Sequence, residues 1–209
     1  MDADAIEIRV LGCLIEKQRT TPDAYPLSLN SLRLTCNQAT NRDPVVDYDE
    51  QTIRAALERL SRKGWTRLAS GVGSRAAKYR HLFDQVVGVS PAELSLLAVL
   101  MLRGPQTPGE LKQRSERLHP FASLEQLHEV LEGLRERKLV ARLERGPGQK
   151  EERYTHLLGG DDPVEAVSAE LSTAVGDERI RTLEERVGEL ENELASLRRE
   201  SQQRGQAKA

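Results

Sequence analysis

Apolar residues recur at helical spacing in six stretches along the first 140 or so residues of the chain, and polar residues fill the positions between them. A stripe that repeats every three to four residues marks the buried face of a helix. The third stretch is the clearest, because Asp49 suits its N-cap and Gly64 its end. Its stripe consists of Ile53, Ala56, Leu57 and Leu60. We therefore predict six helices, the third of them strongly amphipathic.

Two short extended runs follow the third helix, Trp65 to Ala69 and Lys78 to Leu82. Between them lies a turn-rich tip, residues 70–74, which predicts a hairpin. A helix followed by a hairpin is typical of the end of a winged helix-turn-helix domain, in which the helix enters the DNA major groove and the hairpin contacts the backbone beside it. With the two helices before it, this makes residues 1–85 a first winged helix.

The same order of elements recurs after about 75–80 residues, as internal duplications do. Capping boxes are predicted at Thr107–Glu110 and at Ser123–Gln126, and a second hairpin tip at residues 146–148. Residues 90–160 are therefore predicted to be a second winged helix, joined to the first by an apolar linker, Val86 to Val89. The expected fold class is mainly α with small β-hairpin wings: tandem winged helix-turn-helix domains followed by a C-terminal coiled-coil helix.

Residues 161–209 form a tail whose composition differs from that of the preceding part. Residues 177–200 hold three heptads, and the residues after them are predicted to be disordered. The six core positions are Ile180, Leu183, Val187, Leu190, Leu194 and Leu197. β-Branched residues at two a positions with leucine at every d position favour a parallel two-stranded coiled coil, and hence a homodimer. The alternative is a single helix that folds back onto the winged helices.

Basic residues are concentrated in the third helix and its hairpin: between Arg54 and His81 the chain has eight basic residues and one acid, Glu58, although its formal net charge is −2. Phosphate contacts require such a local patch. The predicted nucleic-acid-binding residues are Gln51, Arg54, Arg59, Arg62, Lys63, Arg75, Lys78 and Arg80. Gln51, Arg54 and Arg62 are expected to contact base edges or the backbone, and the hairpin residues to contact phosphates. The alternative for all of them is a solvated polar surface.

The corresponding helix of the second repeat carries four carboxylates on its outer face, at Glu125, Glu129, Glu132 and Glu136. Such a row repels a polyanion. We therefore expect the second winged helix to contact another protein or to support the first, and not to bind DNA.

Composition narrows the class of protein further. The chain has 209 residues, of which 38% are hydrophobic, 31% charged and only 3% aromatic, so base-stacking platforms of the RNA-recognition kind are not expected. Cys13 and Cys36 lie at apolar helical positions and are expected to be buried free thiols, with a redox pair as the alternative. No signal peptide or membrane-length apolar run is apparent, which predicts a cytoplasmic protein.

No arrangement of catalytic residues or of metal ligands stands out, so we expect neither an enzyme nor a cofactor or metal. His81 and His156 occupy equivalent hairpin positions, which indicates a repeated packing role. One polar cluster precedes Pro44: Asn37, Asn41, Arg42 and Asp43. It could line a small-molecule or anion site, but shaping the turn at the helix end is the favoured interpretation.

Two long runs of the sequence carry a resemblance to a known family. The first begins EIRVLGCLIEKQRTTPDAYPLSLN and continues to Trp65, and the second is SPAELSLLAVLMLRGPQTPGELKQRSERLH. Both resemble the bacterial YceH family, over roughly residues 5–158. The resemblance implies a tandem winged-helix fold and supplies no established ligand, reaction or DNA site.

Three functions are compatible with these patterns. The first is a DNA-binding protein, a transcriptional regulator, that reads double-stranded DNA with the first winged helix. The second is a protein-protein interaction scaffold that uses winged helices without binding DNA. The third, less favoured, is a ligand sensor or an enzyme that uses the loop from Asn37 to Asp43.

Overall fold

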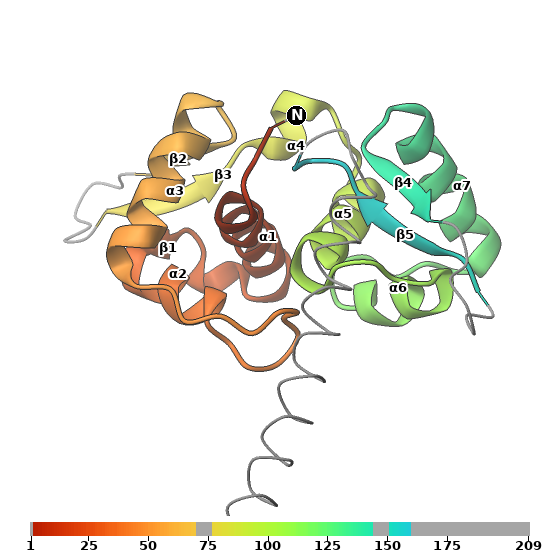
Figure 1. Ribbon diagram of the computed structural model, residues 1–209, viewed down its shortest axis with the longest axis horizontal. Helices are drawn as coiled ribbons and strands as arrows, with labels where there is room; N and C mark the ends of the chain where they lie inside the picture. Colours follow the sequence, from red (N-terminus) through yellow and green to blue (C-terminus); the bar gives the residue numbers. More distant parts are fainter. Residues whose placement is uncertain (1, 70–76, 144–150, 160–209) are drawn as a thin grey trace, which may run out of the picture. The chain divides into compact units, whose positions relative to one another are not determined.

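The computed structural model describes residues 2–69, 77–143 and 151–159, all of which belong to one compact unit. This part of the chain is mainly helical, with small antiparallel sheets (Figure 1). The helices are α1 (Ala5–Thr20), the 3-10 turn η1 (Pro22–Ala24), α2 (Leu29–Cys36), α3 (Glu50–Arg62), α4 (Phe83–Val87), α5 (Pro91–Arg103), α6 (Pro108–Ser115) and α7 (Leu124–Glu136). The strands are β1 (Leu27–Ser28), β2 (Thr66–Leu68), β3 (Lys78–His81), β4 (Val140–Leu143) and β5 (Arg153–His156).

Side-chain caps begin the helices where the sequence predicts them. The carboxylate of Asp49 accepts a hydrogen bond from the backbone N–H of Thr52 at 2.7 Å, and Thr107 forms the predicted reciprocal box with Glu110. The second predicted box is only half formed. Ser123 accepts from the N–H of Gln126, but the Gln126 side chain accepts from the N–H of Ala122 instead of that of Ser123. The box therefore does not close on the cap residue.

Strand β3 is the centre of the first sheet, whose order is β1-β3-β2. Leu27 lies opposite Tyr79 in the pairing of β1 with β3. The predicted hairpin accounts for β2 and β3, whereas β1 has only two residues and too little pattern to be predicted. Strands β4 and β5 pair in the same antiparallel manner, and an isolated bridge joins Gln106 to Tyr154, just before α6. The arrangement is consistent with a winged-helix-like fold.

The expected apolar linker is in part a helix. Phe83 starts α4, and Gly88 ends it in the left-handed conformation with φ of 69°, which glycine adopts without strain. Phe83 is fully buried and packs edge-on against Trp65, with ring centroids 5.1 Å apart. Helix α4 was not predicted, because a single helical turn with one buried aromatic residue leaves no periodic pattern in the sequence.

Helix α1 lies against α5, and their contact joins the residues before and after Gly88 into one hydrophobic core (Figure 1). Its residues from Glu7 to Ile15 are all buried, which explains why the apolar positions of this helix are not confined to one stripe. Gly12 allows the close approach. A Cβ atom at this position would lie 3.0 Å from the side chain of Leu102.

Candidate nucleic-acid interface

Helix α3 is fixed by its apolar stripe and thereby exposes its polar face. Ile53, Ala56, Leu57 and Leu60 are between 0% and 3% exposed. The opposite face presents Gln51, Arg54, Glu58 and Arg62 to solvent. Three of these four are predicted nucleic-acid-binding residues, and the structure brings them together on one surface of one helix.

A hollow of about 450 Å³ lies between this face and the β2–β3 hairpin. Arg54, Glu58 and Arg62 line it from α3, and Arg67 and Leu68 line it from β2. Leu68 is 55% exposed, unusual for a large apolar side chain beside a charged surface. The hollow therefore combines three guanidinium groups, one carboxylate and an apolar wall.

The hairpin places two arginines directly opposite each other. Arg67 of β2 and Arg80 of β3 are register partners in the antiparallel pair, so their side chains leave the same face of the sheet. The Nε atom of Arg80 is buried and has no hydrogen-bond partner within the described residues. Like charges placed directly opposite are unfavourable, and a bound anion would reduce the repulsion between the two guanidinium groups. Arg67 was counted in the basic patch but not predicted as a site residue, although its exposed strand position was readable from the sequence.

Two of the predicted residues face elsewhere. Arg59 Nη2 lies 2.7 Å from Asp4 Oδ2, and Lys63 Nζ lies 2.9 Å from Glu7 Oε1. Lys63 also lies over the ring of Trp65, 5.7 Å from its centroid. Both cations therefore interact with carboxylates at the start of α1. These pairings connect positions more than 50 residues apart, which local sequence patterns cannot reveal.

The remaining hairpin candidates differ in what can be said of them. Lys78 begins β3, partly exposed, opposite Ser28 of β1. Arg80 is partly buried, as described above. Arg75 lies outside the described residues, as do the six predicted coiled-coil positions from Ile180 to Leu197.

Helix α7 presents a surface of opposite charge. Its glutamates at positions 125, 129, 132 and 136 are all exposed, as the sequence predicts. Arg135 donates to Glu132 through Nε at 2.8 Å, so one of the few cations on this helix is already paired. The exposed charge of α7 is therefore mainly negative, in contrast to that of α3.

The loop that precedes Pro44 is pinned by a buried guanidinium. Arg42 is 6% exposed and uses all five of its N–H donors, one of them on Thr35 O and two on the Glu16 carboxylate, with Nη2 to Glu16 Oε2 at 2.6 Å. Asn37 accepts from the N–H of Tyr48 at 2.9 Å. These contacts support the interpretation that Asn37 and Arg42 shape the turn.

Cys13 and Cys36 are both fully buried free thiols, as predicted. Their hydrogen bond to each other, together with burial, raises the pKa of the Cys36 thiol.

His81 is also buried, and its Nε2 lies 2.6 Å from Gln18 Oε1. Burial lowers the pKa of His81 to about 4 and that of His156 likewise to about 4. Both lowered pKa values favour the neutral ring at pH 7. His81 is buried and His156 half-buried, and they occupy equivalent hairpin positions.

The described part of the chain contains neither a cluster of metal-ligating side chains nor a membrane-spanning helix. Within residues 2–69, 77–143 and 151–159, no three histidine, cysteine or carboxylate side chains gather as a metal site requires. No helix in the same ranges is both long and apolar enough to cross a membrane.

Comparison with known proteins gives a consistent family assignment. A family model described as "Protein of unknown function, DUF480" matches residues 3–149. The chain is 50% identical over 202 residues to a UPF0502 protein of Pelobacter propionicus, with 92% of each chain covered. It is 46% identical over 194 residues to a UPF0502 protein of Geobacter sulfurreducens, covering 92% of this chain and 88% of the relative. These matches are consistent with the resemblance to the YceH family.

Proposed function

The chain belongs to the DUF480 family of bacterial proteins of unknown function, and we propose that it binds double-stranded DNA through α3 and the β2–β3 hairpin. In this proposal it is a cytoplasmic binding protein, a transcriptional regulator, and not an enzyme. Arg54 and Arg62 of α3 contact the major groove, and Arg67, Lys78 and Arg80 of the hairpin contact phosphates.

The observation that carries the proposal is that some basic side chains of α3 and the hairpin form ion pairs within the protein and others do not. Arg59 and Lys63 form ion pairs with carboxylates at the start of α1, but the side chains of Arg54, Arg67 and Lys78 make no hydrogen bond or ion pair with any residue in the described ranges. The unpaired cations are those on the face of α3 and the hairpin. A surface with uncompensated positive charge is suited to phosphates, and arginine forms bidentate contacts with guanine.

The proposal includes a tandem arrangement in which only the first unit binds DNA. Residues 1–85 form the first winged helix and residues 90–160 the second. Two features support the duplication: the bridges Leu27–Tyr79 and Gln106–Tyr154 occupy matching places, and His81 and His156 pair with the first residues of β2 and β4. The glutamates of α7 oppose DNA binding by the second unit.

A homodimer through residues 177–200 completes the proposal. If the heptads form a parallel coiled coil, two α3 helices are tethered for a palindromic site with half-sites about 34 Å apart, or a multiple of that. Light scattering on the full chain and on a chain ending at Gly176 tests this part. A monomeric full-length protein, or a fully dimeric shortened one, would contradict it.

The DNA proposal is tested by fluorescence anisotropy with a random duplex at several salt concentrations, beginning at ~50 mM. We expect wild type to bind, and Arg54→Ala to weaken the affinity. Arg59→Ala is the matched control. It removes the same charge from the same helix, but from the side that faces Asp4. Circular dichroism verifies that both variants remain folded.

Failure of wild type to bind at ~50 mM salt would sink the DNA proposal. An equal loss of DNA affinity in Arg54→Ala and Arg59→Ala would indicate that binding depends on net charge and not on the exposed face of α3.

The second candidate function is the protein-protein interaction scaffold, which the exposed glutamates of α7 favour. In that case Glu129→Lys should abolish capture of a partner from cell extract, whereas Arg54→Ala should leave it intact.

A further inference from the structure

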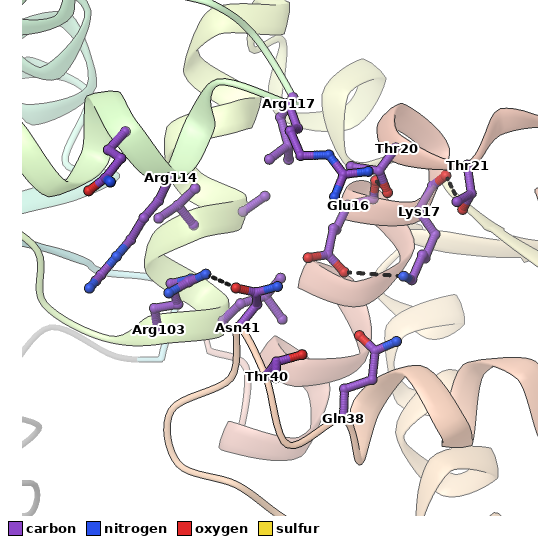
Figure 2. A pocket seen from close by; sticks show the side chains of 15 residues that line it. Glu16, Lys17, Thr20, Thr21, Gln38, Thr40, Asn41, Arg103, Arg114 and Arg117 are labelled. Carbon is purple, nitrogen blue, oxygen red and sulfur yellow. Dashed lines mark hydrogen bonds and ion pairs between the residues drawn. The ribbon is translucent and has the colours of Figure 1, made fainter.

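A second concave surface lies apart from the α3 face, between α1, α5 and α6 (Figure 2). The cavity measures about 580 Å³, within the range of ~300–1,000 Å³ usual for small-molecule sites. Ala98, Val99 and Leu102 of α5 give it an apolar floor. None of the residues that line it also lines the hollow beside α3.

Its charged rim is strongly unbalanced. Four cations line the cavity, Lys17, Arg103, Arg114 and Arg117, against one carboxylate, that of Glu16. The single carboxylate is already neutralised, because the buried Arg42 holds both of its oxygens. Lys17 lies at the limit of an ion pair with it, with Nζ 4.0 Å from Glu16 Oε2. The cavity therefore has a surplus of positive charge.

Two of the arginines lack a carboxylate partner. Arg103 donates to the side-chain oxygen of Asn41, a neutral group, and Figure 2 shows the two side chains facing each other. Burial and the charge of Arg114 lower the pKa of the Arg103 guanidinium. Arg117 makes no hydrogen bond or ion pair with any residue of the described ranges. Arg114, by contrast, lies 3.3 Å from Glu110.

The walls of the cavity are held in place independently of any ligand. Asn41 has a φ of 62°, a left-handed conformation that asparagine tolerates better than most residues. The N–H of Asp43 donates to the carbonyl of Leu102 at 2.8 Å, which ties the loop to α5. Arg42 anchors the same loop to α1 through Glu16. In the loop that ends at Pro44, Asn37 and Arg42 therefore shape the turn, whereas Asn41 lines the cavity.

We propose that this cavity binds a small phosphate-bearing anion. Lys17, Arg103 and Arg117 hold its charge, and the amide N–H of Asn41 donates a hydrogen bond to it. Guanidinium groups bind phosphate oxygens through paired, charge-assisted hydrogen bonds, and a lysine adds a point charge. Because the cations come from α1, α5 and the chain after α6, the ligand joins these elements. Binding therefore stabilises the folded state.

Inorganic pyrophosphate is the probe, titrated from ~10 µM to ~10 mM at constant ionic strength into the full-length protein, with calorimetry and thermal unfolding as readouts. We expect saturable binding and a rise in Tm that follows the occupancy. Arg117→Ala and Arg103→Gln should each weaken binding about tenfold, the effect of losing one charge-assisted contact. Arg117 is exposed, so its replacement should not affect folding.

Arg142→Ala is the matched control, since it removes an exposed arginine that lines neither this cavity nor the hollow beside α3. It should bind pyrophosphate as wild type does. Absence of saturable binding at ~10 mM, or equal affinity in wild type, Arg117→Ala and Arg103→Gln, would overturn the proposal. The anisotropy assay with duplex DNA is run on the same variants. Because Arg117→Ala should retain DNA binding, failure of one proposal is distinguishable from failure of the other.

Discussion

Arg67 of β2 lies directly across the hairpin from Arg80 of β3, so two positive charges share one face of a small sheet. Such a pair lowers the stability of the free protein and favours a bound anion. The two effects have opposite signs, which makes them separable by experiment.

Replacing Arg67 by alanine should therefore raise stability and lower DNA affinity. We expect the free energy of unfolding to increase by roughly 0.2–1 kcal/mol, because the repulsion across the strands is removed. The slope of log affinity against log salt should shrink by about 0.9, the contribution of one phosphate contact. Urea unfolding and anisotropy titrations measure the two quantities. Arg142→Ala is the control, because Arg142 of β4 lies opposite Tyr154 and pairs with Glu152 at 3.3 Å. A loss of stability in Arg67→Ala would refute the argument.

Neutralising Glu58 should strengthen DNA binding. Glu58 is an exposed acid of α3 and the one carboxylate among the residues that line the hollow with Arg54 and Arg62. Its carboxylate repels phosphates and attracts the neighbouring arginines. Glu58→Gln should raise the affinity for duplex DNA about two- to fivefold, as expected for one exposed charge. Glu129→Gln on α7 makes the same change of charge and should have no effect. If both variants gain affinity equally, DNA binding follows net charge and not the α3 face.

Breaking the buried ion pair between Arg42 and Glu16 should be costly. The guanidinium side chain is fully buried, and all five of its donors have acceptors. Removal of Arg42 leaves the Glu16 carboxylate without its partner, so Arg42→Ala should lose about 3–5 kcal/mol of unfolding free energy. Arg42→Lys should recover only part of this, since lysine cannot form the fork. Arg142→Ala, which breaks an exposed pair, should cost less than ~1 kcal/mol in the same urea titrations. A small loss in Arg42→Ala would show that the loop does not depend on this residue.

The two hairpin histidines, whose pKa values are lowered, predict acid sensitivity. The pKa of His81 and of His156 is lowered to about 4 in the folded protein, against an ordinary value of 6.5. Between these values the unfolded chain binds more protons than the folded one, so stability falls as the pH drops from 6.5 towards 4. Unfolding free energies measured by urea titration across this range should decline, and His81→Gln should flatten the decline. His128→Gln, at an exposed position on α7, should leave it unchanged. A flat profile in wild type would show that folding does not lower the pKa of these two histidines.

Local patterns predicted much of the fold because helix periodicity and capping are local. The stripe of α3 and the cap at Asp49 are each set by residues within a few positions of one another. Strand β1 and helix α4 were missed because so few residues carry no usable period. The excess of positive charge on α3 and its hairpin could be predicted from the sequence. Which of these cations form ion pairs within the protein could not. Arg59 pairs with Asp4 across 55 positions, and only the tertiary structure decides which cations remain available.

The cavity between α1, α5 and α6 likewise could not be predicted from local sequence patterns. Asn41 belongs to a polar cluster that the sequence shows, whereas no sequence pattern distinguishes Arg103, at the end of α5, or Arg117, just beyond α6, from other arginines. Their common feature is a shared wall, and that wall is created by the packing of α1 on α5.

The contact at Gly12 has a consequence for how this chain can be engineered. Because a Cβ atom at position 12 would lie 3.0 Å from the Leu102 side chain and 3.1 Å from Met101 Cβ, a larger residue there requires these side chains of α5 to shift. Cutting the chain near Gly88 would separate α1 from α5, so neither the residues before Gly88 nor those after it would keep the whole hydrophobic core. A chimaera that borrows α3 and its hairpin for another protein needs α1 and α2, which α3 contacts, and a surface that takes the place of α5 against α1.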